Sequence, residues 1–338
     1  MSSGMPPPFT FGPVPSRRLG QSLGVNNIPP KHCSYACMYC QLGRTPNMTV
    51  ERQTFFQPEA IADAVQSRLV ECGRAGTAVD YLTLVPDGEP TLDVNLGRLL
   101  TMLRGLGPPL AVITNGSLMD RAKVRSELAI ADWVSVKVDA VDTKTWRLVD
   151  RPHGQLRLEN ILEGLQVFSQ AFRSTLVTET MLVSGVNDSE AALDALATSV
   201  SGIAPAVAYL AVPIRPPAES SVRPPGTDVL VRAYEAFSRL LPRVELLVGE
   251  PPEAVAPSSD VERDLLAITA VHPLDEGAVV ELGGGSSQAL EVAEDLTACG
   301  QLEAVVYGGR RFFVRSFTHS RDQLAGYPPR RRGVTASG

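Results

Sequence analysis

The chain has 338 residues, of which 44% are apolar and 20% are charged. This composition excludes a wholly disordered protein, and the length indicates one large domain with an appendage or two modest domains. The formal net charge of −6 at pH 7 argues against a general binder of nucleic-acid backbones, although it does not exclude a local basic surface. No run of about 18 apolar residues occurs and no apolar signal segment follows the N-terminus, so we expect a cytoplasmic protein with no membrane partner.

Apolar runs of β-type alternate with amphipathic helical segments up to residue 247. The predicted strands are residues 22–25, 81–85, 110–114, 133–138, 176–183 and 208–212. The predicted helices are residues 58–72, 94–106, 121–128, 158–172, 189–200 and 228–241. Each helix is long enough to cross over a sheet and return, so the alternation predicts an α/β fold with a parallel sheet covered by helices. Such units form either an open doubly wound sheet or a curved, partly closed barrel.

Polar and glycine-rich segments follow the predicted strands, at residues 86–90, 114–116, 137–139, 184–188 and 213–217. Barrel and doubly wound enzymes build their sites from the carboxyl ends of parallel strands. The sequence therefore predicts the active face at this edge of the sheet.

The sequence changes in character after Leu247, where residues 250–253 and 256–259 form a proline-rich joint. Beyond it we expect helices at 260–269, capped by Ser258 or Ser259, and at 286–299, capped by Ser286 or Ser287. Residues 302–317 alternate as a hairpin does around two glycines. We therefore predict a barrel domain over residues 1–255, a small winged-helix-like domain over 256–319 and a disordered tail over 320–338.

The partner of this C-terminal module is either a protein or a nucleic acid. The helix at 286–299 contains no lysine or arginine, which argues against insertion into a nucleic-acid groove. Basic residues gather instead in the hairpin and the tail, at Arg310, Arg311, Arg315, Arg321 and 330–332. We favour a protein-docking or regulatory module, with RNA as the alternative partner.

Three of the five cysteines, Cys33, Cys37 and Cys40, fall within eight positions, whereas Cys72 and Cys299 stand alone. Structural zinc sites usually take two pairs of ligands, and no second pair is present. Iron–sulfur clusters normally take four cysteines, so three thiolates leave one iron with an open coordination position. The spacing thus favours an iron–sulfur cluster whose open iron binds a substrate or cofactor.

The spacing CxxxCxxC, with the aromatic Tyr39 directly before the last cysteine, resembles the signature of the radical S-adenosylmethionine (SAM) superfamily. The resemblance implies a 4Fe-4S cluster on Cys33, Cys37 and Cys40, with SAM chelating the fourth iron. It also implies that a reductant such as ferredoxin or flavodoxin supplies the electron that cleaves SAM to a 5′-deoxyadenosyl radical, which abstracts hydrogen from the substrate. The implied fold is a partial (β/α)6 barrel.

Further family motifs follow in order over residues 11–248. The element Gly88-Glu89-Pro90, preceded by Asp87 where the family has glycine, resembles the one that holds the methionyl ammonium of SAM. By the same resemblance Asn115 contacts the methionyl or ribose part, and Asn187 belongs to the element that contacts adenine and ribose. Lys137 pairs with the methionyl carboxylate, Asp139 contacts the ribose, and Val212 lies against adenine. These residues, with Tyr39, are the predicted cofactor contacts.

Within the superfamily, residues 12–20, 40–45 and 214–217 are similar to uncharacterised iron–sulfur oxidoreductases related to the wyosine-base tRNA enzyme. That enzyme uses a second cluster, and this chain has no second cysteine set. Arg17, Arg44 and Arg215 are the candidates for substrate contact: they bind an anionic substrate or form salt bridges at the mouth of the barrel. Arg215 stands among prolines, on a stiff backbone.

The predicted function is a radical SAM enzyme acting on an unidentified substrate. Modification of a small molecule or protein comes first, and modification of a tRNA base is the runner-up. The alternative is an iron- or redox-sensing iron–sulfur regulator with a DNA-binding C-terminal module, which the motifs at 88–89 and 137–139 disfavour because a sensor needs no cofactor cradle.

Overall fold

A curved eight-stranded sheet forms the main body of the protein, seen here in a computed structural model that describes residues 9–247, 260–269 and 273–316. The strand order is β1-β2-β5-β6-β7-β8-β9-β10. The strands are β1 (Thr10–Ser16), β2 (Gly20–Val25), β5 (Tyr81–Leu84), β6 (Leu110–Thr114), β7 (Trp133–Lys137), β8 (Thr175–Met181), β9 (Val207–Ala211) and β10 (Val244–Leu247). Only the pair β1–β2 in this sheet is antiparallel. The sheet is open, with β1 and β10 at its edges.

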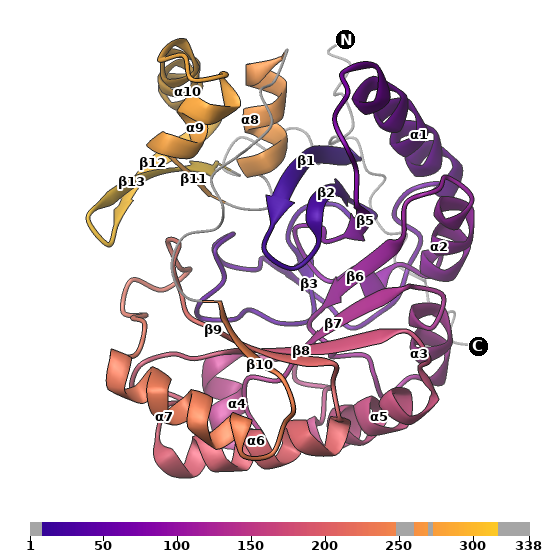
Figure 1. The fold of residues 1–338 in the computed structure, drawn as a ribbon, viewed down its shortest axis with the longest axis vertical. Coiled ribbons are helices and arrows are strands. Elements are labelled where there is room, and N and C mark those ends of the chain that lie inside the picture. The colour runs from indigo at the N-terminus through magenta and orange to yellow at the C-terminus, as the bar shows by residue number, and fades with distance from the viewer. Residues whose placement is uncertain (1–8, 248–259, 270–272, 317–338) are drawn as a thin grey trace, which may run out of the picture.

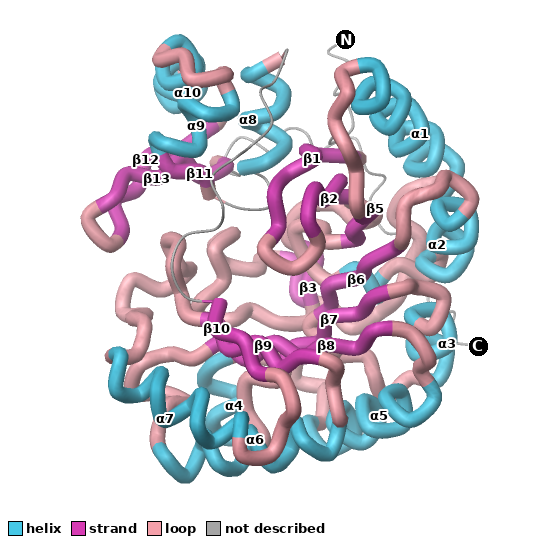
Figure 2. Tube along the Cα trace, viewed as in Figure 1, coloured by secondary structure: helices cyan, strands magenta, loops and turns pink. Residues whose placement is uncertain are grey.

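Helices connect the parallel strands and lie along the outer side of the sheet (Figure 1, Figure 2). They are α1 (Pro58–Arg74), α2 (Leu96–Arg104), α3 (Ala122–Leu128), α4 (Thr143–Val149), α5 (Leu158–Ala171), α6 (Glu190–Ile203) and α7 (Thr227–Ser238). The predicted parallel α/β arrangement is confirmed. The sheet has two strands more than predicted, β1 and β10, so its extent was underestimated.

The apolar residues of the strands and helices are those that are buried on the two sides of the sheet. β9 is buried along its whole length and β7 along most of it, as apolar strands covered on both faces are. α2 buries Leu96, Leu99, Leu100 and Leu103, which is one helical face at spacings of three and four. The main core runs from β2 to β10, and a smaller cluster includes Trp133, Val177 and Tyr209 of the same sheet.

The C-terminal module has its own apolar core. It contains α8 (Val261–Thr269), α9 (Glu276–Leu282), α10 (Gln288–Ala298) and a three-stranded sheet of β11 (Leu274–Asp275), β12 (Leu302–Tyr307) and β13 (Arg310–Arg315). The expected helices and hairpin are present, α9 and β11 are additional, and the winged-helix assignment stays a prediction. The expected caps Ser258 and Ser259, the joint before them and the tail lie outside the described residues. The Ser287 side chain makes no capping hydrogen bond, whereas the Ser286 hydroxyl accepts from the amide of Gln288, the first residue of α10 (3.2 Å).

The module contacts the main body at two places. α8 packs against β1, where Asp264 lies 3.4 Å from the Arg68 guanidinium of α1. At the hairpin, the Tyr307 hydroxyl donates to the carbonyl oxygen of Pro213, in the loop after β9 (3.1 Å). The hairpin therefore touches the edge of the sheet at which the sequence places the active face. Among the described residues, no helix has the length and apolarity needed to cross a bilayer.

Candidate functional site

The three clustered cysteines lie on one loop at the carboxyl edge of the sheet. Cys33 ends the short strand β3 (His32–Cys33), which pairs with β4 (Asn47–Met48). The Cys40 amide donates to the Cys37 carbonyl oxygen (3.0 Å), which closes a tight turn. All three cysteines line one cavity of about 350 Å³ together with residues at or just beyond the carboxyl ends of β5, β6, β7, β8 and β9. The structure thus brings the predicted ligands together on the predicted face.

Burial controls the protonation of these thiols. It raises the pKa of Cys33 to about 12, and the Glu89 carboxylate adds to the effect. Burial, followed by the Asp150 carboxyl, raises the pKa of Cys37 well above its usual range. Burial also raises the pKa of Cys40, although the charge of Lys31 opposes it. Such thiols stay protonated at neutral pH until a bound metal replaces the protons.

Two of the three cysteine sulfurs take part in hydrogen bonds with neighbouring side chains. Within residues 9–247, 260–269 and 273–316, no three His, Cys, Asp or Glu side chains are placed to hold one metal ion. Asn115 Nδ2 donates to Cys33 Sγ (3.5 Å), and the Cys37 thiol donates to Asp150 Oδ1 (3.4 Å). The bond from Asn115 is of the kind by which proteins adjust iron–sulfur clusters, because the sulfur accepts it. The bond from Cys37 requires the thiol proton, which a metal-bound thiolate lacks.

Glu89 lies behind the cavity wall. Its side chain is 1% exposed. One carboxylate oxygen accepts from the Thr91 amide (3.0 Å) and the Thr114 hydroxyl (2.6 Å), and the other accepts from the Asn115 amide (2.8 Å). Glu89 therefore ties the end of β5 to the end of β6, whereas Gly88 and Asn115 line the cavity. Its predicted contact with a methionyl ammonium stays a prediction.

Gly88 is needed because the cysteine loop passes directly over it. Its φ of +152° disfavours any other residue, and a Cβ at this position would collide with the carbonyl oxygen of His32. The Glu89 amide donates to the same oxygen (3.0 Å). Gly88 therefore sets the distance between the end of β5 and Cys33.

Gly88→Ala is expected to lower the free energy of unfolding by about 2 kcal/mol, because the methyl group forces two backbones apart. Iron bound after reconstitution falls with it, since the loop that holds Cys33 is displaced. Denaturant titration and iron analysis measure the two effects. Gly154→Ala is the control, because a Cβ at Gly154 meets no atom within 4 Å; equal losses in both variants would contradict the role of Gly88.

Asp87 offers the cavity an unsatisfied carboxylate oxygen. Its Oδ1 lies 3.6 Å from Lys31 Nζ, and its buried Oδ2 has no hydrogen-bond partner. Burial raises the pKa of Asp87 to about 7 in spite of Lys31. A buried acceptor without a donor is costly, so this oxygen is a fitting partner for a cationic group of a ligand.

A chain of alternating charges crosses the cavity floor. Lys137 Nζ lies 2.7 Å from Glu179 Oε1, and Arg18 lies 2.5 Å from Glu179 Oε2. Lys137 Nζ also lies 4.9 Å from the centre of the Tyr39 ring. Lys137 and Tyr39, both predicted cofactor contacts, line the cavity. Glu179 lines it as well, but it was not predicted from the sequence. An acidic residue inside the apolar run at 176–183 was the available signal.

Glu179 stays ionised and Lys137 stays cationic. Burial by itself raises the pKa of Glu179, but Lys137 and Arg18 outweigh it and hold that pKa at about 2. Burial lowers the pKa of Lys137, but Glu179 and Asp139 outweigh it and raise that pKa above its usual value. The cavity therefore keeps a fixed ammonium group at all physiological pH values.

Asp139 and Asn187 stand behind the cavity wall. The Asp139 carboxylate accepts from the Tyr39 hydroxyl and from the Met181 amide. Asn187 Nδ2 donates to the carbonyl oxygens of Asp139 and Met181 (both 2.8 Å), and its Oδ1 accepts from the Val183 amide (2.8 Å). They fix the ends of β7 and β8 and the position of the Tyr39 ring, while Val212 lines the cavity itself.

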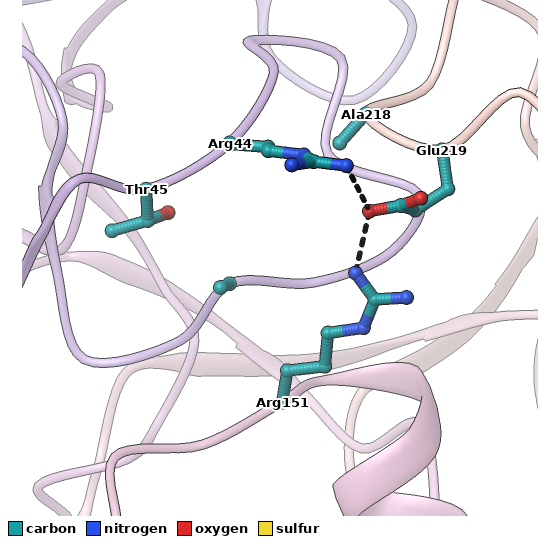
Figure 3. Close-up of a pocket in the computed structure, with 6 residues that line it drawn as sticks. Arg44, Thr45, Arg151, Ala218 and Glu219 are labelled. Atoms are coloured by element: carbon teal, nitrogen blue, oxygen red, sulfur yellow. Dashed lines mark hydrogen bonds and ion pairs between the residues drawn. The ribbon is translucent and has the colours of Figure 1, made fainter.

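The arginine candidates divide between two places. Arg17 and Arg215 line the cysteine cavity. Arg44 instead borders a separate cavity of about 360 Å³ beside the cysteine loop (Figure 3). Its side chain is 83% exposed and lies 3.8 Å from Glu219, which also pairs with Arg151 (2.7 Å). The structure does not bring Arg44 to the cysteines.

The sequence of this chain is similar to those of known proteins. The profile of the Radical SAM superfamily matches residues 27–196. UPF0026 protein MJ1312 of Methanocaldococcus jannaschii is 41% identical over 322 residues, which cover 95% of this chain and 99% of that protein. The probable GTP 3′,8-cyclase of Pyrococcus horikoshii is 26% identical over 160 residues and covers 47% of each chain.

The crystal structure of a radical SAM methyltransferase from Sphaerobacter thermophilus has a TM-score of 0.50 at 16% identity, covering 68% of this chain and 67% of that one. This likeness concerns the fold alone. The comparisons give no support to the alternative of a regulator. The chain belongs to the radical SAM superfamily, and it is an enzyme whose cofactors are a 4Fe-4S cluster and SAM.

Proposed function

We propose that this enzyme reductively cleaves SAM in the cysteine cavity and abstracts a hydrogen atom from a small substrate bound beside it. The observation that carries the proposal is that three thiols, an unsatisfied carboxylate oxygen and a fixed ammonium group line one cavity. When bound, the cluster and SAM supply the one-electron chemistry. A reductant such as ferredoxin or flavodoxin provides the electron.

The residues of the chain bind and orient the cofactors. Cys33, Cys37 and Cys40 hold the cluster, and the Asn115 side chain donates to the first of these sulfurs. Asp87 Oδ2 and the backbone at Gly88 accept from the methionyl ammonium.

The methionyl carboxylate and the adenine of SAM contact residues at the ends of β7 and β9. Lys137 pairs with the methionyl carboxylate through a charge-assisted hydrogen bond. Val212 provides an apolar surface for adenine. Asp139 and Asn187 act through Tyr39 and the strand ends, since both stand behind the wall.

A small molecule is favoured over tRNA as substrate. The Pyrococcus relative is named for a small-molecule substrate, a nucleotide. The first test is anaerobic reconstitution followed by reduction in the presence of SAM. The protein is expected to release 5′-deoxyadenosine, and failure of iron-loaded protein to do so would refute the proposal.

Asp87→Asn is expected to weaken SAM binding about tenfold, the equivalent of about 1.4 kcal/mol, because the amide lacks the negative charge that attracts the ammonium. Equilibrium dialysis with cluster-loaded protein measures the affinity. In the wild type the affinity should rise as the pH rises through 7, where Asp87 ionises, and the rise should be smaller in the variant. Asp63→Asn, at an exposed position of α1, is the control; equal affinities of the two variants would exclude Asp87 from the contact.

A further inference from the structure

A second cavity, of about 220 Å³, adjoins the cysteine cavity. It lies toward β1 and β2, and Phe11, Val14 and Ile113 give it apolar walls. The two cavities share Arg17, Arg18 and Arg215. Among the described residues that line it there is neither a cysteine nor a carboxylate. The smaller cavity thus combines an apolar interior with guanidinium groups at the boundary to the cluster site.

The charges at this boundary are unequal. Arg18 pairs with Glu179 (2.5 Å), a carboxylate that it shares with Lys137 and that lines the cysteine cavity but not the smaller one. Arg215 donates to the Gln41 side-chain oxygen (3.3 Å), and within the described parts of the chain it forms no ion pair with an acidic residue. Burial, with Arg17 and Arg310 adding to it, lowers the pKa of Arg215 to about 10. Among the described residues, no carboxylate is therefore paired with Arg215 at this boundary.

The position of Arg215 is fixed from two sides. Its loop continues as Pro216-Pro217, which restricts the backbone. The loop also begins at Pro213, whose carbonyl oxygen accepts from the Tyr307 hydroxyl of the C-terminal hairpin (3.1 Å). A guanidinium held on a stiff backbone loses little conformational freedom when it binds a planar or tetrahedral anion.

We propose that Arg215 and Arg17 bind the anionic group of the substrate, a phosphate or a carboxylate, in the smaller cavity. The reacting carbon then lies in the cysteine cavity, next to the cofactors. This inference rests on the proposed function, and it narrows the substrate class to small anions. Guanidinium groups bind both kinds of anion through paired hydrogen bonds, so the experiment has to separate the two.

The test uses cluster-loaded protein saturated with SAM, without reductant, under anaerobic conditions. Inorganic phosphate and acetate are titrated separately by calorimetry. Arg215→Gln is expected to weaken the binding of at least one anion tenfold or more, and the anion that the wild type binds more tightly identifies the group. The affinity of Arg215→Lys for that anion should lie between those of the wild type and Arg215→Gln, because lysine keeps the charge but lacks the planar guanidinium group.

Arg239→Gln is the matched control. Arg239 lies at the end of α7 and its side chain is 70% exposed. It pairs with Asp194 (3.7 Å) and donates to the carbonyl oxygen of Glu235 (3.3 Å). The control should leave both affinities within twofold of the wild type. If thermal melting shows that Arg215→Gln is unfolded, Arg17→Gln replaces it, with the same expected loss.

Two results overturn the inference: neither anion binds the wild type, or the arginine variants bind both anions as the wild type does. The outcome for the proposed function is read separately, from release of 5′-deoxyadenosine by reduced wild-type protein. Protein that cleaves SAM but binds anions independently of Arg215 and Arg17 refutes the anion site alone. Protein that binds phosphate through Arg215 but leaves SAM intact refutes the proposed function, and with it the assignment of the anion to a radical substrate.

Discussion

Cys37→Ala is expected to reduce bound iron from about four atoms per chain to a small fraction of that and to abolish release of 5′-deoxyadenosine from SAM. In the proposed site the cluster has three protein ligands, so the loss of one thiolate leaves two irons without a protein bond. Cys37 also donates to Asp150 and stands among carboxyl groups that oppose its ionisation. Only metal binding stabilises a thiolate at this place, and the alanine variant removes that option. Iron analysis, the visible spectrum and chromatography of the reduced reaction measure the effects.

The controls are the two cysteines outside the cluster loop. Cys72 is buried on α1 and Cys299 is exposed in the C-terminal module. Cys72→Ala and Cys299→Ala should retain both the iron and the cleavage reaction. Retention of both properties by Cys37→Ala would refute the assignment of this cysteine as a ligand.

Local patterns predicted most of the fold, and the missed elements are those in which the local pattern is weak. β1 carries Gly12, Pro13 and Pro15, which are residues typical of turns, and its strand conformation depends on pairing with β2. α4 is short and buries only Trp146 and Val149. In both cases tertiary contacts outweigh the local preference.

The grouping of Cys33, Cys37 and Cys40 in one cavity was predictable, because all three lie within one loop and are therefore close in space as well as in sequence. Glu179 could not be predicted in this way, because its partners Arg18 and Lys137 are 161 and 42 residues away. The sequence also does not show whether a side chain at a strand end points into the cavity or away from it. Glu89 and Gly88 are neighbours in sequence, but only Gly88 faces the cavity.

Glu179→Gln is expected to lower the free energy of unfolding by about 3 kcal/mol at pH 7, because removal of one partner leaves buried charge uncompensated. Here two cations, Lys137 and Arg18, lose the same carboxylate. Urea titration of the cluster-free variant and wild type measures the difference without the folding energy that the metal adds. Glu59→Gln is the control: Glu59 pairs with Arg98 on the surface, where both side chains are about half exposed, so its loss should cost no more than about 1 kcal/mol.

The pH dependence separates an ionic role of Glu179 from a merely steric one. The pKa of Glu179 is about 2 in the folded protein and about 4.3 in an unfolded chain. A carboxyl group with a depressed pKa stabilises the fold above its unfolded pKa and loses that contribution as the pH falls through the folded value. The gap between wild type and Glu179→Gln should therefore be full at pH 6 and shrink steadily from about pH 4 toward pH 2. A gap that stays constant over this range would mean that the glutamine merely packs badly. The Glu179 carboxylate would then not be the group that keeps Lys137 cationic, and the proposed contact of Lys137 with the methionyl carboxylate would lose this support.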